Sequence, residues 1–102
     1  MAKKLLQINF KFDGTAEELG KAFLPVAQPI ADQTGLKWKV WCWNDDVREC
    51  AGEYLFEDAA SVEAYLGGPI VEQVKAHPSI SDLSAKVFDI MEEPTKITRG
   101  PI

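Results

Sequence analysis

The spacing of hydrophobic side chains divides the chain into segments of two kinds, and their order restricts the possible folds. Residues 4–12 alternate apolar and polar side chains, which is the pattern of a β-strand. Residues 16–32 carry apolar side chains at helical spacing instead. Two more alternating segments, 36–43 and 48–56, lie close together in the sequence and predict a β-hairpin.

The second half of the chain again places a helix before a strand. Asp58 precedes a predicted helix at 59–66, and Gly67-Gly68-Pro69 separates it from a second helical piece that ends at Ala76. Residues 79–91 hold the last predicted strand. The order βαββαβ predicts one α+β domain over residues 1–102. Its fold is ferredoxin-like, with a four-stranded antiparallel sheet, helices on one face and an extended C-terminal tail at 92–102.

The ends of the first helix are marked by specific residues. Thr15 and Glu18 have the spacing of a capping box, in which each satisfies a free backbone amide of the other. Pro25 and Pro29 fall inside the predicted helix, where each removes one backbone hydrogen bond. We therefore expect a kink or a split there.

Composition argues against several classes of protein. The 16 acidic and 11 basic residues give a net charge of −5, which is unfavourable for binding nucleic acid. Two cysteines and one histidine match no zinc pattern, and no glycine-rich phosphate loop is present, so we expect no metal and no tightly bound nucleotide. No apolar run approaches the length of a membrane span or a signal peptide, which predicts a cytoplasmic protein.

The register of the hairpin decides which aromatic residues face the helices. A loop centred on Asp46 places Cys42 opposite Cys50 and Trp38 opposite Tyr54. A loop of even length would instead set the face of Trp38 beside that of Glu53. We prefer the first register because it keeps the apolar face whole.

The opposite face of the sheet is then too apolar for a monomer. Its predicted members, which we expect to form a homodimer interface between two sheets, are Leu5, Gln7, Trp41, Trp43, Leu55 and Phe88. Lys39, Glu53 and Lys86 fall on the same face, either as a charge network inside the dimer or as solvated charges at its ends.

The strongest candidates for a functional site are the aromatic residues between sheet and helices. Trp38 and Tyr54 could be catalytic, with their N–H and O–H groups orienting a substrate oxygen, and Phe10, Phe23 and Tyr65 could complete a substrate-binding pocket. The alternative is that these side chains only pack the core. His77 is a candidate base because its ordinary pKa lies near neutrality, although its place at the end of a helix favours a capping or exposed role.

Several stretches resemble one protein family. The segments 35–41 (GLKWKVW), 51–58 (AGEYLFED), 64–66 (AYL) and 85–89 (AKVFD) are similar to the YdhR family of small proteins assigned as monooxygenases, with matching spacings over nearly the whole chain. The resemblance implies a dimeric α+β barrel, as in antibiotic-biosynthesis monooxygenases. It also implies oxygenation of a small aromatic or polyketide-like substrate by molecular oxygen without flavin, haem or metal. Two alternatives remain: a small-molecule-binding or stress-response dimer without catalysis, and an oxygen-independent lyase or isomerase.

Overall fold

The computed structural model describes residues 2–102 and contains four strands and four helices. The elements that were predicted are present in the predicted order: β1 (Lys4–Phe12), α1 (Ala16–Ala31), β2 (Leu36–Asn44), β3 (Glu49–Phe56), α2 (Ala59–Leu66), α3 (Pro69–Ala76) and β4 (Ile80–Asp89). A short helix that was not predicted, α4 (Glu92–Ile97), follows them.

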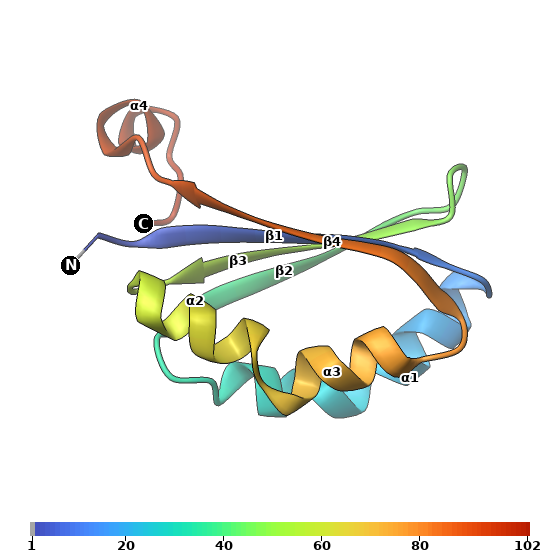
Figure 1. Cartoon of the computed structure of the whole chain (residues 1–102). Coiled ribbons are helices and arrows are strands. Elements are labelled where there is room, and N and C mark those ends of the chain that lie inside the picture. The colour runs from blue at the N-terminus through green and yellow to red at the C-terminus, as the bar shows by residue number, and fades with distance from the viewer. Residues whose placement is uncertain (1) are drawn as a thin grey trace.

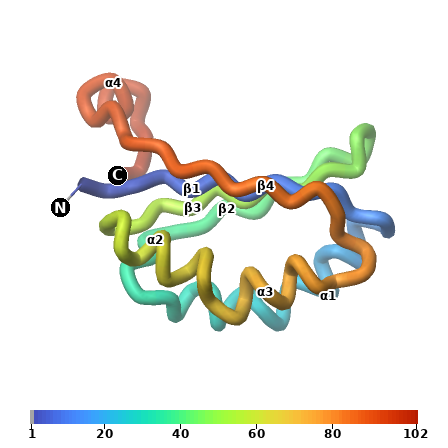
Figure 2. The backbone as a smooth tube through the Cα atoms, viewed as in Figure 1, coloured from blue at the N-terminus to red at the C-terminus, as the bar shows by residue number. Residues whose placement is uncertain are grey.

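The sheet has the strand order β2-β3-β1-β4, and each neighbouring pair is antiparallel. Helices α1, α2 and α3 cover one of its faces, which we call the helix face (Figure 1). The tube view shows the sheet as one open, twisted layer above these helices (Figure 2). This arrangement confirms the ferredoxin-like α+β fold.

Strand β1 lies at the centre of the core because it pairs on both sides. Its alternate residues Leu6, Ile8, Phe10 and Phe12 are all buried on the helix face. Phe56 from β3 and Val62 and Tyr65 from α2 pack against them. The strict alternation seen in the sequence therefore corresponds to one buried face.

Local signals at the helix ends are also confirmed. The Thr15 side chain accepts a hydrogen bond from the Glu18 amide, and the Glu18 carboxylate accepts one from the Thr15 amide. Asp58 caps α2 by accepting a hydrogen bond from the Ser61 amide. Hydrogen bonding to Ser61 lowers the pKa of the Asp58 carboxyl group. Helix α1 runs through Pro25 and Pro29 as one element, so the expected split is absent within residues 16–31.

The C-terminal segment is not the extended tail that was predicted. Residues 92–97 form α4, which lies on the side of the sheet opposite α1–α3, here called the open face (Figure 1). The chain then returns to the sheet, where the Pro101 carbonyl accepts from the Trp38 indole at 2.9 Å and the Ile102 carbonyl accepts from the Lys3 ammonium at 3.1 Å.

The register predicted for the hairpin is wrong. Leu36 pairs with Phe56, but Trp38 pairs with Leu55, so Lys37 is an extra residue in β2. Such a bulge reverses the side chains that follow. Beyond it Lys39 lies opposite Tyr54 and Trp43 opposite Cys50, whereas Trp38 and Cys42 face the other way.

Within residues 2–102, no helix is both long and apolar enough to cross a membrane.

Candidate functional site

The pairing of β2 with β3 across the four-residue turn places a lysine and two tryptophans on the helix face. Lys39, Trp41 and Trp43 lie opposite Tyr54, Gly52 and Cys50, whose side of β3 faces α1. Gly52 has no side chain, and a Cβ atom there would stand 3.0 Å from both the Lys39 Cε and the Tyr54 Cε1 atoms. The glycine thus leaves the space through which the Lys39 side chain crosses the sheet surface.

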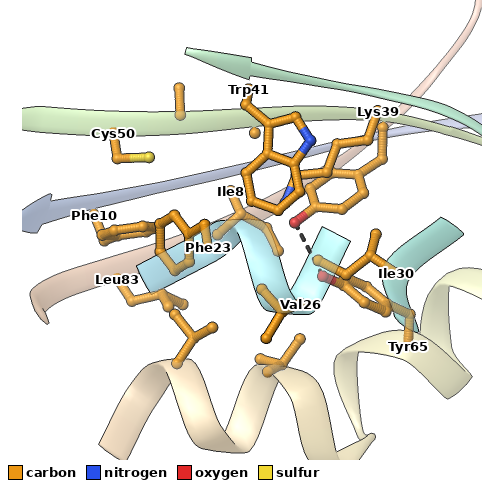
Figure 3. Close-up of a pocket in the computed structure, with 15 residues that line it drawn as sticks. Ile8, Phe10, Phe23, Val26, Ile30, Lys39, Trp41, Cys50, Tyr65 and Leu83 are labelled. Carbon is orange, nitrogen blue, oxygen red and sulfur yellow. Dashed lines mark hydrogen bonds between the residues drawn. The ribbon is translucent and has the colours of Figure 1, made fainter. Parts of the chain in front are cut away.

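A small, largely apolar cavity of about 30 Å³ lies between the sheet and the helices. Its walls include Phe10, Phe23, Tyr54 and Tyr65, the four pocket residues predicted on this side, together with Lys39 and Trp41 (Figure 3). The volume is close to that of a single water molecule in the liquid. A substrate would therefore have to displace side chains to reach this depth.

The Lys39 amine is held in an unusual environment. Its Nζ atom lies 3.3 Å from the centroid of the Trp41 ring and 4.5 Å from that of Tyr54. No carboxylate forms an ion pair with it in the described part of the chain. Burial disfavours the charged ammonium form and lowers the pKa of Lys39 to about 7, while the electrostatic interaction with Cys50 opposes this shift to a smaller extent. The amine can therefore gain or lose a proton near neutral pH.

Two phenols provide the other polar groups of the cavity. The Tyr54 and Tyr65 hydroxyls are 3.0 Å apart and share a hydrogen bond, which Figure 3 marks as a dashed line. Burial raises the pKa of both side chains, so both stay protonated at neutral pH. Because only one hydroxyl hydrogen is used in the pair, the other is free to be donated to a ligand.

A larger groove of about 310 Å³ lies beside the cavity, between α1 and β2. Phe23, Trp41 and Cys50 line both hollows, and the rings of Phe23 and Trp41 are 5.6 Å apart. This aromatic pair therefore separates the inner cavity from the groove. Trp43 also lines the groove, and its indole N–H is buried without a hydrogen-bond partner among residues 2–102.

Two of the predicted catalytic residues lie away from the cavity. The Trp38 indole points to the C-terminal segment through its bond to Pro101, so the predicted Trp38–Tyr54 pair does not form. His77 lies at the end of α3 beside Phe12, and its Nδ1 atom accepts from the Ser79 amide at 3.1 Å. The position of His77 fits the helix-end alternative.

The open face has a different composition from the one predicted. Leu5, Gln7, Leu55 and Phe88 do lie on it, but Trp41 and Trp43 are on the helix face. Lys39, which was also predicted on the open face, lies on the helix face because it shares the register of Trp41 and Trp43. Gln7 donates to the Glu53 carboxylate at 2.9 Å, and Leu55 is only 2% exposed between Leu5 and Trp38 on the neighbouring strands.

Neither cysteine forms a disulfide within the described residues. Cys42 is exposed on the open face and Cys50 is buried on the helix face. Burial raises the pKa of the Cys50 thiol to about 11, which leaves it a weak nucleophile.

Sequence reasoning did not predict that Lys39 and Gly52 line the cavity, or that Trp41 lines both the cavity and the groove. Two signals pointed to them: the polar turn between β2 and β3 is four residues long, an even number, and Gly52 interrupts an otherwise bulky strand. Both features favour the register that was rejected, because the large side chains of β2 fill the space that the glycine leaves.

Comparison with solved structures supports the fold. SnoaB from Streptomyces nogalater, a cofactor-independent oxygenase, superposes with a TM-score of 0.73 at 16% identity over 90% of this chain and 96% of that one. An antibiotic-biosynthesis monooxygenase homologue from Deinococcus radiodurans gives 0.70 at 16% identity, covering 87% and 93%. The haem degrader MhuD from Mycobacterium tuberculosis gives 0.66 at 18% identity, covering 85% and 95%.

Sequence comparison identifies the family more directly. No curated protein sequence matches the chain. A family model described as "Putative mono-oxygenase ydhR", however, matches residues 5–101. The match spans nearly the whole chain, and the resemblance found in the sequence is confirmed. The chain belongs to the ydhR family.

Proposed function

We propose that the protein is a cofactor-independent monooxygenase that oxidises a small aromatic or polyketide-like compound with molecular oxygen. The observation that carries the proposal is the Lys39 amine, which lies in an aromatic cavity and has a pKa of about 7. Such a group can remove a proton from an acidic substrate at neutral pH. The family and the structural similarity to a cofactor-independent oxygenase support the reaction type.

The chemistry requires only an electron-rich substrate, such as a phenol or enol with an acidic C–H bond. Lys39 accepts the proton, and the carbanion formed transfers one electron to oxygen. The two radicals combine into a carbon-bound peroxide, whose outer oxygen takes back the proton held by Lys39. Loss of a second proton from the same carbon leaves a carbonyl group and breaks the O–O bond, and the hydroxide released combines with that proton to form water. Both electron pairs come from the substrate, so no flavin, haem or metal is needed.

The aromatic walls would hold the substrate in position. The groove between α1 and β2 supplies apolar surface, and the free hydrogen of the Tyr54–Tyr65 pair is a donor for a substrate oxygen. Entry to the cavity from this groove requires Phe23 and Trp41 to move apart.

Oxygen uptake with anthrone-like and quinol compounds tests the proposal. Lys39→Met should reduce the rate by about 100-fold or more, because a positioned base contributes at least that factor. Lys37→Met is the matched control, since Lys37 pairs with Glu57 on the surface at 2.8 Å. Trp38→Phe should also retain activity, because Trp38 lies outside the cavity and its indole donates a hydrogen bond to the Pro101 carbonyl.

The outcomes separate this proposal from the alternatives. Ligand quenching of tryptophan fluorescence without product would indicate a binding protein. Equal turnover in the absence of oxygen would indicate a lyase or isomerase. Unchanged oxygen uptake by Lys39→Met would overturn the assigned role of Lys39.

We also propose a homodimer formed through the open face. Val40 and Phe88 on this face are 51% and 45% exposed, beside the Gln7–Glu53 pair. A mixture of apolar and polar side chains is typical of a protein interface. The proposed interface contains Leu5, Gln7, Val40 and Phe88, without Trp41 and Trp43.

A further inference from the structure

The Lys39 amine differs from other lysines of the chain in what surrounds it. Lys4, Lys11, Lys21, Lys37 and Lys96 form ion pairs with carboxylates. The Lys39 head group instead lies among aromatic rings, in a cavity that shares Phe23, Trp41 and Cys50 with a groove of mostly apolar walls. A neutral amine in such a place has a free electron pair and little competing water.

We propose that Lys39 is also a covalent binding site, which forms an imine with a small aromatic aldehyde entering from the groove between α1 and β2. This activity is separate from oxygenation, because it requires a carbonyl group and no oxygen. It uses the same electron pair of the amine as a nucleophile rather than as a base.

The reaction balances without a further reactant. The Nζ electron pair attacks the carbonyl carbon, a C–N bond forms and the carbonyl oxygen takes a proton. The nitrogen then loses its two hydrogens as protons, the C–O bond breaks and the oxygen leaves as water. Nothing is oxidised or reduced. The free hydrogen of the Tyr54–Tyr65 hydroxyl pair provides a proton donor in the same cavity.

The surrounding side chains favour an aromatic aldehyde over an aliphatic one. Phe10, Phe23 and Trp41 present rings to the cavity, and ring-to-ring packing stabilises an aromatic ligand. The groove volume of about 310 Å³ is at the lower end of the range for ligand sites. A single-ring aldehyde suits it better than a polycyclic one.

Trp41 controls access to the amine. Its ring covers Nζ at 3.3 Å, so the ring must turn aside before a carbonyl carbon can approach. The side chain is 38% exposed on the edge strand β2 and borders the groove as well as the cavity, so it has space to move.

The experiment is reductive trapping with benzaldehyde and cyanoborohydride at pH 7.5 under nitrogen, followed by intact mass and peptide mapping. Lys39 should be labelled about tenfold or more faster than Lys37, because an amine with a pKa of about 7 is mostly neutral at this pH whereas an ordinary lysine is not. Lys39→Arg should abolish the fast adduct, and Lys37→Arg should retain it. Circular dichroism of each variant checks folding.

Labelling of Lys39 at the rate of Lys37, or no label on Lys39, would overturn the imine site. The oxygenation proposal would still stand if the wild-type protein took up oxygen and Lys39→Met did not, because proton transfer to Lys39 needs no carbonyl. Conversely, fast labelling of Lys39 in a protein that takes up no oxygen would support the imine site and overturn oxygenation. The two proposals therefore fail separately.

Discussion

A lysine that crosses an apolar interior destabilises the fold whenever it carries its charge. Lys39 has a folded-state pKa of about 7, below its ordinary value of 10.5. Between these two values the unfolded chain binds more protons than the folded chain, so stability rises with pH. Below pH 7 both states are protonated, and the full cost of burying the ammonium group is present.

The first prediction at this scale concerns the pH dependence of stability. Lys39→Met should raise the free energy of unfolding most at or below pH 7. The advantage should shrink by up to about 1.4 kcal/mol per pH unit as the pH rises from 7 towards 10.5. Urea denaturation from pH 6 to 10 measures this difference. A constant difference, like that expected for Lys37→Met, would contradict the burial of an unpaired amine.

The second prediction compares Gly52 of the inner cavity with Gly20 of the neighbouring groove. A Cβ at Gly52 would meet Lys39 and Tyr54 atoms at 3.0 Å, so Gly52→Ala should cost about 1–3 kcal/mol of stability through overpacking. Gly20 in α1 has no atom within 4 Å of such a Cβ, and Gly20→Ala should stabilise by about 0.5–1 kcal/mol. Chemical denaturation measures both. Equal effects of the two changes would show that no space is reserved at Gly52.

At the scale of elements, α4 and the last residues are tied to the sheet by a single indole hydrogen bond and the Lys3 contact. Trp38→Phe should cost about 1 kcal/mol and speed amide hydrogen exchange in residues 92–102. Trp43→Phe is the matched control, because the Trp43 N–H has no partner among residues 2–102. Unchanged exchange after Trp38→Phe would mean that this bond does not hold the segment.

Periodicity predicted the elements well but not which way β2 faces. The nine-residue alternation of β1 and the caps at Thr15 and Asp58 are local signals, and the structure follows them. The direction in which the β2 side chains point depends on the four-residue turn, on one extra residue, Lys37, and on the space at Gly52, which lies opposite Trp41 on the neighbouring strand. Packing decides which set of alternate β2 residues faces the helices, so Lys39 could not be assigned to the cavity from spacing alone.

At the scale of the whole molecule, the open face is covered by α4 and the C-terminus at one end only (Figure 1). The proposed dimer predicts that Val40→Asp and Phe88→Asp produce monomers in light scattering at micromolar concentration. Val47→Asp is the control, because Val47 is similarly exposed, at 48%, but lies in the hairpin turn. A monomeric wild-type protein would contradict the dimer.

The most direct test of the central claim is an NMR titration of the Lys39 amine. Lysine labelled with ¹³C and ¹⁵N, with Lys39→Arg to assign the signal, reports the protonation of Nζ without any substrate. A midpoint near pH 7 is the result expected for an unpaired amine buried between Trp41 and Tyr54. A midpoint above pH 10 would contradict it, and with it the roles of Lys39 as base and as nucleophile.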